Sequence, residues 1–92
     1  MSNKMAKKII IRGIVQGVGM RHFVSVQARK NSLLGYVRNI SNGQVECLIQ
    51  GDETNIKAFL KTLRTQAPGQ IDDLDIEDTN LNQKLESFSI KF

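Results

Sequence analysis

The chain has 92 residues, of which 13 are Lys or Arg and 9 are Asp or Glu, for a formal net charge of +4. This length suits one domain over residues 1–92, and 40% hydrophobic residues can build a modest core, which excludes wholesale disorder. No apolar stretch approaches the roughly 20 residues that span a bilayer, and no signal peptide is evident. We therefore expect a cytoplasmic protein without membrane contacts.

Charge is unevenly distributed along the chain. Residues 1–51 carry a net charge of +7 and residues 52–92 a net charge of −3. An anionic partner would therefore be sought on surfaces built by the first half, although a solvated basic face gives the same pattern. Cys47 is the only cysteine, so no internal disulfide can form, and no His/Cys cluster with zinc-ligand spacing is present. We expect no metal and no cofactor.

The first predicted elements are a strand and a helix joined by a glycine-bearing loop. Lys7–Arg12 is rich in isoleucine and predicts a strand, and the loop runs from Gly13 to Gly19. Apolar residues then recur at three- and four-residue steps, which predicts an amphipathic helix up to about Asn31. These residues are Met20, Phe23, Val24 and Ala28.

Two strands follow, joined by a tight turn. Tyr36–Ile40 and Val45–Ile49 are rich in strand-forming residues, and Asn42-Gly43 between them is a strong hairpin signal because both residues tolerate positive φ. Strand alternation places Val37 and Asn39 on one face of the first strand.

A second helix and two further strands complete the pattern. The helix is predicted by apolar residues at i, i+3, i+4 and i+7, with Asp52 as its N-cap and Pro68-Gly69 after its end. The four apolar residues are Ile56, Phe59, Leu60 and Leu63. The acidic segment 71–79 predicts a half-exposed strand whose carboxylates stay solvated, and Phe88, Ile90 and Phe92 alternate in a last strand. The predicted fold is α+β, a ferredoxin-like split βαβ sandwich with two helices on one face of an antiparallel sheet.

The loop before the first helix carries the candidate chemistry. Gly17 and Gly19 let successive backbone N–H groups turn inward, and the free amides of the next helix add to this anion-binding nest. Arg21 at the rim offers donors matched to phosphate oxygens. The loop lacks the Gly-Lys-Ser/Thr of a Walker A motif, and His22 stands where a dinucleotide motif has its third glycine. From glycine spacing alone, a plain structural turn remains open.

The segment from Gly13 to Arg21 resembles the signature loop of the acylphosphatase family. The resemblance continues in the family's order and spacing through Leu34-Gly35-Tyr36-Val37-Arg38-Asn39 and Asn42-Gly43-Gln44-Val45-Glu46, and it is strong over residues 7–65. Met20 stands where the family commonly has Phe, and Asn42 where it often has Asp. Neither departure removes a chemical group from the site.

The resemblance implies metal-independent hydrolysis of the carboxyl–phosphate bond of small acyl phosphates. By this resemblance, the loop amides and Arg21 would hold the phosphoryl group, and Asn39 would orient the attacking water. The loop residues concerned are Gln16, Gly17, Val18, Gly19 and Met20. Inorganic phosphate would be a product and a competitive ligand, and the protein is expected to be a monomer that binds no nucleic acid.

Other interpretations of the same residues remain open. Asn39 could bond its own turn backbone, His22 could be a surface residue, and Cys47 fits a small core residue. A nucleic-acid-binding module on the same fold would suit the basic first half, but no base-stacking aromatic motif is present. A further alternative is an acylphosphatase-like domain that handles carbamoyl phosphate within a larger assembly.

Overall fold

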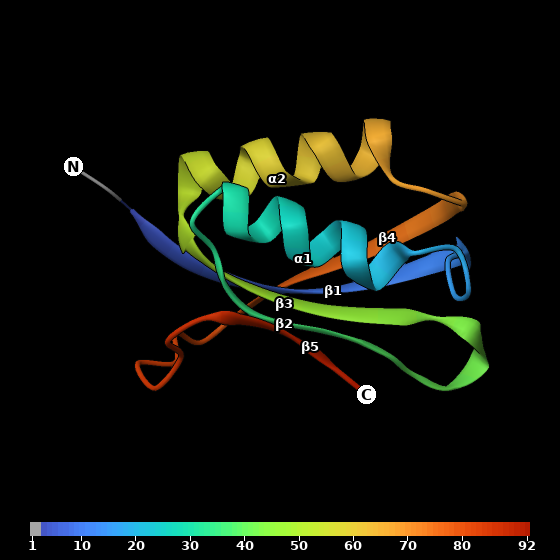
Figure 1. The fold of residues 1–92 in the computed structure, drawn as a ribbon. Helices are drawn as coiled ribbons and strands as arrows, with labels where there is room; N and C mark the ends of the chain where they lie inside the picture. Colours follow the sequence, from blue (N-terminus) through green and yellow to red (C-terminus); the bar gives the residue numbers. More distant parts are fainter. Residues whose placement is uncertain (1–2) are drawn as a thin grey trace.

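The computed structural model describes residues 3–92, which form a five-stranded sheet covered on one face by two helices (Figure 1). The elements follow the predicted order β-α-β-β-α-β-β. Their bounds are β1 (Lys4–Ile14), α1 (Met20–Lys30), β2 (Leu34–Asn39), β3 (Val45–Asp52), α2 (Glu53–Gln66), β4 (Gln70–Thr79) and β5 (Phe88–Lys91). Within residues 3–92, neither helix has the length and apolar character needed to cross a membrane.

The sheet has the strand order β4-β1-β3-β2-β5 and is mixed rather than antiparallel throughout. β2 pairs antiparallel with β3, as the predicted hairpin requires, and β1 pairs antiparallel with both β3 and β4. β5, however, runs parallel to β2. The reason is the route of the chain: after β4 it crosses beneath the sheet to the far edge, where β5 begins beside the start of β2 (Figure 1). The side chain of Gln50 on β3 holds this connecting segment in place, because it donates one hydrogen bond to the Asn82 backbone and accepts another from it.

The core lies between the sheet and the two helices. Alternating residues of the central strands meet the apolar stripes of α1 and α2, and all of the predicted stripe residues except the partly buried Phe23 are buried. The predicted second stripe is confirmed in full, and Cys47 is a fully buried core residue. The members with no exposed surface are Ile9, Ile11, Val24, Ala28, Val37, Val45, Cys47, Ile49, Phe59 and Leu63.

The turn between β2 and β3 has the geometry that the sequence predicts. Asn42 and Gly43 have φ values of 66° and 77°, within a short 3₁₀ turn at Ser41–Gly43. Both lie in the left-handed region that Asn and Gly tolerate best. This turn and the loop between β1 and α1 lie at the same end of the molecule (Figure 1).

Asp52 occupies the N-cap position of α2, but the predicted capping bond from its side chain is absent. The backbone amide of Glu53, the first residue of α2, donates to the carbonyl oxygen of Asn3, at 2.9 Å. An N-cap carboxylate would instead accept from the amide at the second or third helical position, and Asp52 makes no such bond.

Candidate functional site

In the loop between β1 and α1, the backbone lies in the left-handed region at Gly17 and Gly19. Gly17 and Gly19 have φ values of 75° and 85°, and a Cβ added at either position would have no heavy atom within 4 Å. These positions thus combine a conformation that favours glycine with unobstructed space beside the backbone. A loop of this kind leaves its amides accessible to a ligand.

The N-terminus of α1 adds further free donors. Gly19 is the N-cap and makes no side-chain cap, and its carbonyl accepts from the amide of Phe23 at 3.0 Å. The amides of the first turn therefore have no partner within the helix. No acidic residue lies in that turn, so the positive end of the helix dipole is not neutralised locally.

A pocket of about 280 Å³ opens beside this helix end. Five of the residues predicted for the site line it together, contributed by the loop, by the start of α1 and by the end of β2. These are Gly17, Gly19, Met20, Arg21 and Asn39. The remaining lining residues are Val15, His22, Ile90 and Phe92, so no carboxylate side chain lines the pocket.

The side chains of Gln16 and Val18 point to other partners. Gln16 donates from Nε2 to the carbonyl oxygens of Ile40 and Gln44, at 2.9 and 2.8 Å. It thereby ties the loop to the β2–β3 turn, immediately after Asn39. Val18 packs against the core. Only the backbone of these two residues remains available for the predicted anion nest.

Arg21 lies half-buried at the pocket with two contacts from the end of β5. Its Nη1 donates to the carbonyl oxygen of Lys91 at 3.3 Å, and its guanidinium carbon lies 4.8 Å from the centre of the Phe92 ring. No carboxylate within residues 3–92 forms an ion pair with Arg21. The remaining guanidinium donors are therefore available to an anion.

Asn39 is the last residue of β2 and is exposed. It pairs with Val45 and shares a strand face with Val37, as the alternation predicts. Among the hydrogen bonds of residues 3–92, none involves the Asn39 side chain, so the turn-bonding alternative is not realised in this structure.

Sequence reasoning missed the contribution of β5 to this pocket. Ile90 and Phe92 line it because β5 pairs with β2 in parallel, which places Ile90 opposite Val37 on the helix-covered side. Their alternation with Phe88 was visible in the sequence and indicated a common face. The neighbouring strand was not, because long-range strand pairing leaves no local signal.

The remaining candidate groups lie outside this chemistry. Burial raises the pKa of the Cys47 thiol well above its usual range, as expected for a core cysteine. Within residues 3–92, no group of three or more His, Cys, Asp or Glu side chains is arranged to hold a metal ion.

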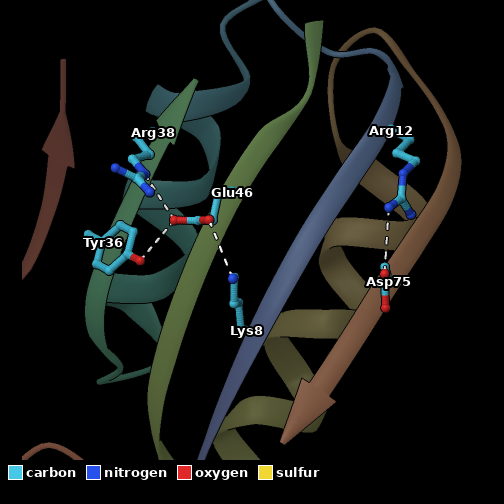
Figure 2. A network of polar contacts seen from close by, with 6 residues as sticks. All are labelled: Lys8, Arg12, Tyr36, Arg38, Glu46 and Asp75. Atoms are coloured by element: carbon cyan, nitrogen blue, oxygen red, sulfur yellow. Dashed lines mark hydrogen bonds and ion pairs between the residues drawn. The ribbon is translucent and has the colours of Figure 1, made fainter. Parts of the chain in front are cut away.

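The uncovered face of the sheet carries a polar network centred on Glu46, which is 6% exposed (Figure 2). Its Oε1 accepts from Tyr36 Oη and Arg38 Nε, both at 2.9 Å, and its Oε2 lies 3.7 Å from Lys8 Nζ. Burial by itself would raise the pKa of Glu46, but the bonds from Tyr36 and Arg38 and the charges of Arg38 and Lys8 outweigh it and lower that pKa. The network joins β1, β2 and β3.

Comparison with known proteins identifies the family. The family model for acylphosphatase matches residues 7–90. An acylphosphatase from Bacillus licheniformis is 38% identical over 86 residues, which cover 92% of this chain and 96% of that protein. The crystal structure of acylphosphatase from Bacillus subtilis superposes with a TM-score of 0.89 at 32% identity, covering 96% of this chain and 99% of that one.

A longer protein is also similar. A probable carbamoyltransferase HypF from Methanocaldococcus jannaschii is 44% identical over 89 residues, which cover 95% of this chain but only 12% of that protein. The chain thus spans about an eighth of this relative and nearly all of the shorter acylphosphatases.

The chain belongs to the acylphosphatase family. It is accordingly a hydrolase with the ferredoxin-like α+β fold of that family, and family and fold together support acyl phosphate hydrolysis.

Proposed function

We propose that the pocket beside α1 hydrolyses small acyl phosphates, with the amides of residues 16–20 and the Arg21 guanidinium binding the phosphoryl group and Asn39 orienting the attacking water. The observation that carries this proposal is the shared pocket: it joins an open glycine loop, an arginine without a carboxylate partner and an unbonded asparagine amide. Together they supply donors for an anion and a separate polar group for a nucleophile.

The chemistry demands little beyond this inventory. An acyl phosphate carries a carboxylate as its leaving group, so general acid catalysis is not needed to expel it. Phosphoryl transfer then depends mainly on positioning and on stabilising charge spread over the phosphoryl oxygens. The amides and Arg21 serve that charge, and the Asn39 side chain can accept a hydrogen bond from water. The water's proton can pass to the substrate's own phosphate oxygen.

The test is hydrolysis of benzoyl phosphate by the purified protein with EDTA present. Removing the guanidinium in Arg21→Ala should lower kcat/KM by about 10²–10³-fold, the effect typical of one lost transition-state donor. Arg12→Ala is the matched control, because Arg12 pairs with Asp73 and Asp75 on the other face of the sheet. Inorganic phosphate should inhibit the wild type competitively.

The proposal fails if the wild type shows no turnover above the Arg21→Ala background, or if Arg12→Ala loses as much activity as Arg21→Ala. Loss of turnover in EDTA that is restored by a divalent cation would contradict the metal-independent mechanism. The absence of turnover in the wild type would leave a pocket that binds an anion without processing it.

A second candidate follows from the likeness to the probable carbamoyltransferase. In this alternative the pocket hydrolyses carbamoyl phosphate, whose acyl group is small and polar. The same loop and arginine would hold the phosphoryl group, so Arg21→Ala does not distinguish the two. The ratio of kcat/KM for carbamoyl phosphate to that for benzoyl phosphate does.

A further inference from the structure

Phe92, which follows β5, is fully exposed, with a relative accessibility of 101%. Two other large hydrophobic residues within residues 3–92 are exposed, Ile14 and Leu81, and neither lines the pocket. Leaving an aromatic ring in water forgoes the stabilisation that its burial would give. An exposed ring at a pocket mouth is therefore a candidate ligand surface.

The position of the ring relative to Arg21 says which part of a ligand it would meet. The Arg21 guanidinium carbon is 4.8 Å from the ring centre, within the range of a cation–π contact. The proposed phosphoryl group binds this guanidinium. In an acyl phosphate a single oxygen separates the phosphorus from the acyl carbon, so the acyl group lies within reach of the same ring.

The rest of the pocket provides apolar walls next to this ring. Val15 and Met20 are buried in the lining, and Ile90 is half-buried. The volume of about 280 Å³ approaches the lower end of the roughly 300–1,000 Å³ typical of small-molecule sites. The pocket can therefore receive more of a ligand than its phosphoryl group.

The backbone that leads to Phe92 is held in place. β5 pairs with β2 over Phe88 to Lys91, and Arg29 donates to the carbonyl oxygen of Phe88 at 3.0 Å. Arg21 in turn bonds the carbonyl oxygen of Lys91. An anchored backbone and a ring with few internal rotations lower the entropy lost when a ligand packs against it.

We propose that Phe92 determines acyl-group specificity by packing against flat apolar acyl groups, so that the enzyme prefers aromatic acyl phosphates to acetyl or carbamoyl phosphate. This inference rests on the proposed function and extends it to the class of substrate. It assigns to Phe92 a contact with the acyl group, separate from its contact with Arg21.

The kinetic test compares benzoyl, acetyl and carbamoyl phosphate with wild type, Phe92→Ala and Phe92→Tyr. Phe92→Ala should lower kcat/KM for benzoyl phosphate about five- to tenfold through KM, the size expected for one aromatic contact. The values for the two small substrates should stay within twofold, and Phe92→Tyr should resemble the wild type. Leu81→Ala, which removes an exposed apolar side chain away from the pocket, is the control.

A uniform loss for all three substrates in Phe92→Ala would overturn the inference, because Phe92 would then act only by placing Arg21. Equal kcat/KM for the three substrates in the wild type would also overturn it.

A binding measurement separates this inference from the proposed function. Calorimetry with phenylphosphonate and methylphosphonate needs no turnover. Tighter binding of phenylphosphonate that disappears in Phe92→Ala supports the aromatic contact even if the protein hydrolyses no acyl phosphate. Turnover without any preference for the phenyl compound would leave the proposed function standing and refute the role of Phe92.

Discussion

At the scale of single residues, Asn39 has the most informative surroundings. It ends β2 beside the pocket, and no hydrogen bond of its side chain is found within residues 3–92. A strand-end asparagine with a structural role would bond a nearby backbone group. A side-chain amide left open beside the glycine loop is instead available to a water molecule.

Replacement of Asn39 by Ala should therefore act on turnover. We expect kcat for benzoyl phosphate to fall about 10²–10³-fold with KM within twofold, because under the proposed function the lost group orients the nucleophile and does not bind the phosphoryl group. Steady-state kinetics on the folded variant measure both. A raised KM at unchanged kcat would mean that Asn39 binds substrate and does not orient water.

Gly19→Ala tests the role of the loop backbone, and Gly43→Ala is the matched control. Both glycines have φ near +80° and open space at the Cβ position, so alanine should cost each about 1–2 kcal/mol of stability through backbone strain. Only Gly19 lines the pocket. We expect Gly19→Ala to lose at least tenfold in kcat/KM and Gly43→Ala to stay within threefold. Denaturant unfolding and benzoyl phosphate kinetics supply the two readouts, and equal activity losses would contradict a role of Gly19 in the nest.

Much of this site could be predicted from local sequence. The glycines, Arg21 and the face of Asn39 all follow from short-range spacing, and the pocket brings them together. The Gln16 side chain could not be assigned in this way. Its two acceptors, the carbonyls of Ile40 and Gln44, are brought within reach only by the folded β2–β3 turn.

At the scale of elements, β1, β2 and β3 are joined on the uncovered face by the Glu46 network (Figure 2). The strands were predictable from composition and alternation, but the Glu46 network that connects them was not. Glu46, Tyr36 and Lys8 come from three strands whose register depends on the whole sheet.

Glu46→Gln should show a stability loss that depends on pH. Its pKa is lowered in the folded state, so its charge stabilises the fold above the unfolded value of about 4.3, and this contribution disappears as the pH falls through the folded pKa. We expect the variant to unfold about 1.5 kcal/mol more easily at pH 7, the scale of a hydrogen bond to a charged group. The difference from wild type should shrink between about pH 5 and pH 3.

Asp75→Asn is the control for this experiment. Asp75 lies 3.5 Å from Arg12 on the same sheet, but its side chain is 44% exposed, so the change should stay below about 0.5 kcal/mol at every pH. Denaturant unfolding across the pH range measures both variants. A Glu46→Gln deficit that is constant with pH would show that packing, not charge, underlies the effect.

At the scale of the whole molecule, basic and acidic residues are concentrated in different elements. The basic first half builds β1, α1, β2 and β3, and no acid from any element lines the pocket. The acidic run belongs to β4 at the far edge, where it has one neighbouring strand, β1. Charged side chains on an edge strand discourage pairing with other chains. The prediction that these acids stay solvated holds for the exposed Asp72 and Glu77, whereas Asp73, Asp75 and Asp78 pair with Arg12 and Lys7 of β1.

The overall architecture was also largely predictable, because helical and strand periodicities are local and two amphipathic helices need one sheet face. The direction of β5 was not predicted. It depends on the crossing of residues 80–87 beneath the sheet, which Gln50 and Asn82 fasten across more than 30 positions of sequence.

The short β5 has a consequence for local unfolding. This four-residue edge strand supplies Ile90 to the pocket and the Lys91 carbonyl to Arg21, so its detachment would remove part of the site while the rest of the sheet stays folded. A ligand bound only by the closed form suppresses such openings. We expect inorganic phosphate at 100 times its Kd to slow amide hydrogen exchange in residues 88–91 by up to about 100-fold.

In Arg21→Ala the same phosphate concentration should leave the exchange of residues 88–91 unchanged. Protection spread evenly over β3 and β5 in the wild type would refute this coupling, since it would report global stabilisation only. If the coupling holds, the lifetime of the assembled pocket is set by how often one edge strand leaves β2.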